Sequence, residues 1–153
     1  MNFLKGIVLG FIAGAISALT VHEFISWLFS NPDLWVGWDR LSWSKEPVNN
    51  ILLPDVAIPQ IISTMIWGGL WGALFGVILG PRPQGSMTIQ GAILGLFGPA
   101  LIGVLVAVPL LTQKYPIFYD GDAGKVIPVL AIMAGFGAAT AWLYGMFRYG
   151  RLP

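Results

Sequence analysis

The chain has 153 residues, of which 56% are hydrophobic and only 10% are charged, and its mean hydropathy is +0.78. Soluble domains carry about 25% charged residues, so this composition excludes an ordinary soluble domain and predicts an all-α integral membrane protein of one domain, residues 1–153. The net charge of +1 excludes a basic surface for nucleic acid, and the lack of cysteine excludes disulfides, thiolate metal sites and cysteine-ligated clusters.

The first apolar stretch, residues 3–29, is predicted to be a transmembrane helix. After Lys5 the apolar run continues to residue 29, which exceeds the 7–15 residues of a signal-peptide core, so we expect the segment to be retained. Gly6, Gly10 and Gly14 recur every four residues and therefore share one helix face. Trp27 stands where an aromatic residue of the membrane interface is expected.

A long polar connection, residues 31–58, is predicted to lie in the headgroup region. It contains three prolines, four acidic residues, and the tryptophans Trp35, Trp38 and Trp43. Two interpretations stay open for this tryptophan-rich loop. It is either an interfacial cap on the helices or a docking surface for a partner protein or cofactor.

The second predicted helix covers residues 59–79, with Pro59 in its first turn. Its glycines also recur every four residues: Gly68, Gly72, Gly76 and Gly80. Each glycine in a helix interior costs roughly 1 kcal/mol relative to alanine, but in lipid such a glycine ridge lets a neighbouring backbone come close. We therefore expect the other helices to pack around this one. Trp67 and Trp71 share a further face and are candidates for partner contacts.

Two further transmembrane helices are predicted at residues 88–111 and 126–147. Both carry ridges of small residues, at Gly91, Gly95 and Gly103 on the third helix and at Gly137, Ala141 and Gly145 on the fourth. Pro99 interrupts the third ridge, and a proline in mid-membrane predicts a kink or, alternatively, a hinge or ion-coordinating break.

The charges predict that both termini are cytoplasmic and that the two longer loops, residues 31–58 and 112–125, lie outside the bacterial inner membrane. Four basic residues and no acids lie on the terminal side: Lys5, Arg82, Arg148 and Arg151. The loops carry four basic residues as well, so the segregation of six acids into the loops decides the orientation. Asp120 and Asp122 match a calcium loop only in composition, and no metal site is predicted.

His22 and Glu23 are the candidate polar site, because an ionisable residue inside a span is a functional hypothesis. At about 1.5 Å per residue from Lys5, His22 lies about 25 Å along a hydrocarbon core about 30 Å thick, close to the outer headgroups. The two side chains are expected to point about 100° apart on the helix. Three roles stay open for His22: a structural bond, a ligand to a quinone, haem or chlorophyll, and, with Glu23, a relay of protons or ions.

The segment Pro59-Gln60 leading into Trp67–Gly72 (WGGLWG), with His22 near the end of the first helix, resembles a group of small proteobacterial inner-membrane proteins. The resemblance extends over about the whole chain and is specific at Trp67–Gly72. It implies four helices and carries no known activity, so no functional residue is transferred from it.

Ridges on all four helices exceed what one small bundle needs internally, which predicts a non-catalytic accessory subunit of a larger respiratory or photosynthetic membrane complex. Its partners are then other integral-membrane subunits and lipids. A small oligomeric channel or transporter, with His22 and Glu23 near its outer mouth, is the alternative. A third hypothesis is a carrier of a cofactor or pigment bound through His22. Enzymatic hydrolysis is not expected, because the single histidine lacks a preorganised set of partners.

Overall fold

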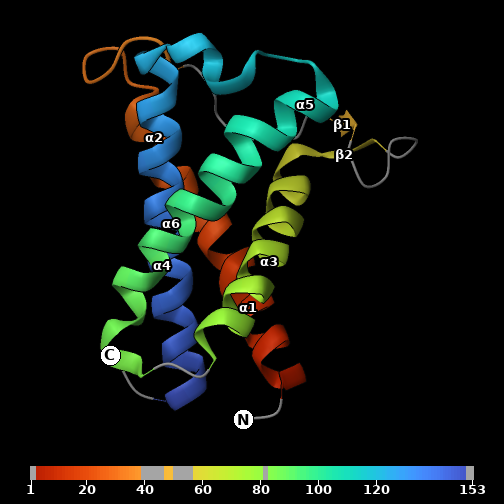
Figure 1. Ribbon diagram of the computed structural model, residues 1–153, viewed down its shortest axis with the longest axis vertical. Helices are drawn as coiled ribbons and strands as arrows, with labels where there is room; N and C mark the ends of the chain where they lie inside the picture. Colours follow the sequence, from red (N-terminus) through yellow and green to blue (C-terminus); the bar gives the residue numbers. More distant parts are fainter. Residues whose placement is uncertain (1–2, 39–46, 50–56, 81–82, 151–153) are drawn as a thin grey trace.

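The computed structural model describes residues 3–38, 47–49, 57–80 and 83–150. Four apolar helical spans, each long enough to cross a membrane, run along its longest axis (Figure 1): Phe3–Phe29, Gln60–Leu79, Gln84–Thr112 and Ala123–Tyr149. The prediction of an all-α protein with four candidate transmembrane helices is confirmed.

Two of the spans change helix type along their length. The first span consists of α1 (Phe3–Ser17), the π-helical η1 (Ala18–His22) and α2 (Glu23–Phe29), and the second is α3 (Gln60–Leu79). The third consists of the short 3₁₀ turn η2 (Gln84–Ser86), α4 (Met87–Gly95), the π-helical η3 (Leu96–Ala107) and α5 (Val108–Thr112). The 3₁₀ turn η4 (Ile117–Gly121) then leads into α6 (Ala123–Tyr149).

A small antiparallel hairpin, β1 (Pro47–Asn49) with β2 (Ala57–Pro59), precedes α3 and was not predicted. Pro47 pairs with Pro59 and Asn49 with Ala57. The hairpin and η4 lie at one end of the bundle, and the first turn of α1 and the last turn of α6 lie at the other (Figure 1). We call these the hairpin end and the terminal end.

Two helix boundaries differ from the predicted ones for local reasons. Pro59 has the extended backbone of β2 (φ −52°, ψ 137°), so α3 begins at Gln60 and not at Pro59. The helix α6 begins three residues before the predicted residue 126, because the Asp122 side chain accepts a hydrogen bond from the Gly124 N–H at 2.9 Å and caps the first turn.

Glycines bring the backbones of the antiparallel helices α1 and α3 into direct contact. A Cβ atom added at Gly10 would overlap the Gly72 carbonyl oxygen, and one added at Gly14 would overlap the Gly68 carbonyl oxygen. A Cβ atom at Gly76 would likewise overlap the Gly6 carbonyl oxygen. Any side chain at these positions would therefore force the two helices apart.

The antiparallel helices α4 and α6 are joined in the same way. A Cβ atom at Gly91 would overlap the Gly137 carbonyl oxygen, and one at Gly95 would overlap the Met133 carbonyl oxygen. The described ridges of these four helices thus contact one another within the chain.

Gly103 and Gly80 do not continue the ridges to which the sequence assigned them. From Leu96 to Ala107 the backbone closes wider π-helical turns around Pro99, which change the phase of the residues that follow. Cβ atoms at Gly98 and Gly103 would lie 3.0 and 3.4 Å from the Trp71 ring of α3, so these glycines accommodate that ring. A Cβ at Gly80 would meet its own helix and the Tyr144 hydroxyl, and no atom of α1 is among its nearest contacts.

The Gly72→Ala substitution tests the contact between α1 and α3. Helix propensity alone favours alanine by about 1 kcal/mol, but the added methyl would overlap the Gly10 carbonyl and lie 2.7 Å from the Gly14 Cα position. We expect the free energy of unfolding in detergent to fall by roughly 1–3 kcal/mol. Gly85→Ala is the control, because a Cβ there meets no atom within 4 Å. A Gly72→Ala variant as stable as the wild type would contradict this packing.

Candidate functional site

His22 and Glu23 form a hydrogen-bonded pair inside the first span. The His22 Nδ1 atom lies 2.8 Å from the Glu23 Oε1 atom, and the two side chains are only 15% and 7% exposed. Neighbouring residues of a regular α-helix do not face each other, so the sequence did not predict that the ends of these two side chains would meet. Their contact forms at the junction where the π-helical η1 ends and α2 begins.

The pair fixes which nitrogen of the imidazole is engaged. An ionised carboxylate only accepts hydrogen bonds, so the Nδ1 atom carries the hydrogen when Glu23 is ionised. In the neutral imidazole the Nε2 atom then offers a lone pair for a second interaction, whereas in the imidazolium it donates. On α6 the Phe136 ring meets the imidazole edge to face, with the ring centroids 6.5 Å apart. Glu23 and Phe136 together therefore hold the ring in one orientation.

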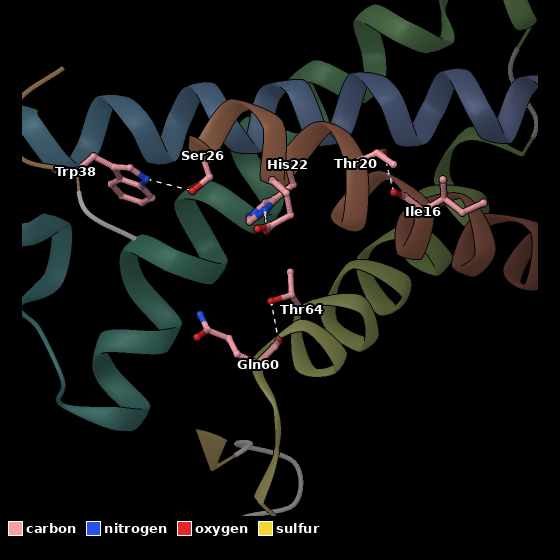
Figure 2. A network of polar contacts seen from close by, with 8 residues as sticks. Ile16, Thr20, His22, Ser26, Trp38, Gln60 and Thr64 are labelled. Carbon is pink, nitrogen blue, oxygen red and sulfur yellow. Dashed lines mark hydrogen bonds and ion pairs between the residues drawn. The ribbon is translucent and has the colours of Figure 1, made fainter. Parts of the chain in front are cut away.

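Two further side-chain hydrogen bonds lie on the same side of the bundle, toward the hairpin end (Figure 2). The side chains of His22 and Thr64 extend toward each other from the first span and from α3, and the Thr64 hydroxyl donates to the Gln60 carbonyl at 3.0 Å. The Trp38 Nε1–H donates to the Ser26 hydroxyl at 3.2 Å, one turn beyond His22. The start of the tryptophan-rich loop is thus bound to the span that carries the site.

Three of the tryptophans proposed as partner contacts interact within the chain. Trp35 donates from Nε1 to the Gly124 carbonyl at 2.8 Å, Trp38 donates to Ser26, and Trp71 packs against the glycines of η3. The first two contacts bind the start of the loop, residues 31–38, to the first span and α6.

The remaining tryptophans differ in their surroundings. Trp27 is 57% exposed and stacks on the equally exposed Phe24 ring, with centroids 6.1 Å apart. Trp67 is half-buried on α3. Trp43 lies outside the described residues. The pair Phe24–Trp27 therefore presents a joined aromatic surface to the surroundings of the bundle.

A line of polar side chains follows one face of α6 toward the terminal end. Thr140, Tyr144 and Arg148 are spaced by four residues and continue the face of Phe136. The buried Tyr144 hydroxyl donates to the Gly76 carbonyl at 3.1 Å, and Arg148 donates to the Leu79 carbonyl at 3.4 Å. Sequence reasoning missed this line, although the four-residue spacing was available as a signal.

The described residues provide no group of three or more His, Asp or Glu side chains that is placed to hold a metal ion. Near the hairpin end, Asp122 uses its carboxylate to cap α6 and to pair with Lys125 at 3.6 Å. The His22–Glu23 pair itself is equipped for hydrogen bonding and proton exchange.

Comparisons with known proteins leave the site to be interpreted from its own geometry. No protein family, no curated protein and no solved structure matches this chain. The resemblance to the small proteobacterial membrane proteins stays a prediction.

The single histidine makes the pair directly observable, because a ¹⁵N-histidine label reports on His22 alone. In bilayers near neutral pH we expect the NMR spectrum to show a hydrogen on Nδ1, since Glu23 accepts from that atom. The Glu23→Gln variant should lose this preference for one tautomer, whereas the exposed Thr20→Val variant should keep it. A wild-type spectrum without hydrogen on Nδ1 would contradict the geometry.

Proposed function

We propose that the protein is a small membrane channel or transporter that passes protons, with His22 and Glu23 as its outer site. The observation that carries the proposal is the buried hydrogen bond between an imidazole and a carboxylate within a span. Imidazole and carboxylate groups can each accept and donate a proton, so the pair can exchange protons with a neighbouring group. Ionisable residues inside a membrane are costly and mark ion paths or proton relays.

The polar line on α6 adds to this support. A proton relay needs further polar groups across the membrane besides His22 and Glu23. Thr140, Tyr144 and Arg148 lie one turn apart on a helix that packs against the first span. They extend a polar face from the level of His22 toward the terminal end.

We further propose an orientation of the protein in the membrane and a way in which its helices associate. The terminal end is cytoplasmic and the hairpin end lies outside the bacterial inner membrane, which the acids of the long loops support. The glycine contacts between α1 and α3, and between α4 and α6, drive helix association in lipid, where the hydrophobic effect does not. We also propose that the protein assembles into a homo-oligomer. Its migration on a native gel tests this assembly.

The second candidate is the accessory subunit of a larger membrane complex. The glycine ridges no longer argue for it, because the described ridges contact each other. What favours it is the exposed stack of Phe24 and Trp27, since aromatic residues are enriched in protein interfaces as well as at membrane surfaces.

Reconstitution into liposomes tests the leading proposal. Purified wild-type protein is expected to collapse an imposed pH gradient, and His22→Gln and Glu23→Gln are expected to reduce the flux to that of empty liposomes, because each removes one half of the proton-exchanging pair. Thr20→Val serves as the control, since its hydroxyl is exposed and bonds only to the Ile16 carbonyl at 2.8 Å.

A wild-type protein without proton flux would overturn the transport proposal. Migration on a native gel with fixed larger subunits would then favour the accessory subunit. A visible absorbance band that is lost in His22→Ala would instead favour the carrier of a haem or chlorophyll.

A further inference from the structure

Two buried hydroxyl groups in the helices lack the hydrogen bond to the preceding helical turn that other hydroxyls of this protein make. Thr20, Thr64 and Thr112 each donate to the carbonyl four residues earlier. Ser17 and Thr140 do not, and their hydroxyl oxygens have no hydrogen-bond partner among the described residues. Both side chains are completely buried, at 0% exposure. A buried hydroxyl group without a hydrogen-bond partner is unfavourable, so we expect each of the two oxygen atoms to bind a polar ligand.

The register of α1, η1 and α6 places the two hydroxyls at one level. The His22 ring meets Phe136, and the Ile25 side chain lies against Gly135, so the first span and α6 run antiparallel. Thr140 is one α-helical turn from Phe136 toward the terminal end. Ser17 is one π-helical turn, five residues, from His22 in the same direction.

We propose that Ser17 and Thr140 together bind a water molecule between the first span and α6. A buried water molecule needs two to four polar partners, and two hydroxyls provide both donors and acceptors. A Ca²⁺ or Mg²⁺ ion would need about six oxygen ligands or more, which two neutral hydroxyls do not supply. The chemistry at this level therefore fits water and not a metal cation.

This water connects the His22–Glu23 pair to the inner half of the bundle. Tyr144, the next hydroxyl-bearing residue on this face of α6, lies one helical turn of about 5.4 Å beyond Thr140, toward the terminal end. In this relay the water accepts a proton released by the pair and passes one of its own to the Tyr144 hydroxyl oxygen, which releases its own proton toward the terminal end, and the pair is reprotonated from the hairpin end. This relay role rests on the proposed proton transport.

Magnetisation transfer from water protons in bilayer samples tests the water site without any substitution. By solid-state NMR we expect rapid transfer to the Cβ carbons of Ser17 and Thr140 and none to that of Ala141, which is equally buried. In the Ser17→Ala variant the transfer to Thr140 should be lost, because the water loses one of its partners. Absence of transfer to both Ser17 and Thr140 in the wild type would overturn the site.

A double-mutant cycle with Ser17→Ala and Thr140→Val tests whether the two hydroxyls share one ligand. We expect the unfolding equilibrium constants to depart from additivity by about threefold or more. Cycles that pair Thr20→Val with either variant should be additive, since Thr20 bonds within its own helix. Additivity between Ser17→Ala and Thr140→Val would overturn a shared water.

Proton flux distinguishes the relay from the outer site. Thr140→Val is expected to lose most of the flux, and Thr140→Ser, which keeps the hydroxyl, is expected to retain it. If His22→Gln abolishes flux while Thr140→Val leaves it unchanged, the relay is overturned and the outer site stands.

Discussion

The close contact of glycine backbones is the constraint on which the remaining structure depends. Helices in lipid gain little from burying apolar side chains against each other, so small residues that let backbones approach decide which helices pair. Gly10 and Gly14 on α1 fit against Gly72 and Gly68 on α3, and Gly91 fits against Gly137 on α6. The two antiparallel pairs leave large side chains such as Phe75, Phe136 and Tyr144 to fill the space between them.

The polar groups occupy the layer where these two pairs meet. The first span brings His22, Glu23 and Ser17 to this layer, and α6 brings Thr140 and Tyr144. In the described part of the chain the buried polar side chains thus gather along the first span and α6 and are not scattered over all four helices. A protein that needed only to fill lipid-facing volume would have no use for a buried carboxylate, because each such group is costly in hydrocarbon.

Sequence patterns predicted the four spans and most glycine faces, since length, hydropathy and four-residue spacing are local properties. They failed where helix type changes. Gly103 left its predicted face because the π-helical turns around Pro99 alter the phase, and His22 meets Glu23 at the end of a second π-helical segment. The hairpin of three-residue strands was not predictable, because its strands are too short for an alternating pattern. The sequence could not predict that Ser17 and Thr140 lie at the same height in the bundle, because this depends on the register between two helices that are far apart in the chain.

Glycine-selective ¹³C labelling in bilayers tests the helix pairing most directly, because it needs no substitution at the contacts. Through-space NMR correlations should join Gly10 with Gly72 and Gly91 with Gly137, residues that are far apart in the sequence and whose backbones touch across each pair. These cross-peaks would establish the arrangement that sets the level of the polar groups between the first span and α6. Correlations confined to glycines of the same helix would show that the helices pair differently. They would also contradict the polar site described between the first span and α6.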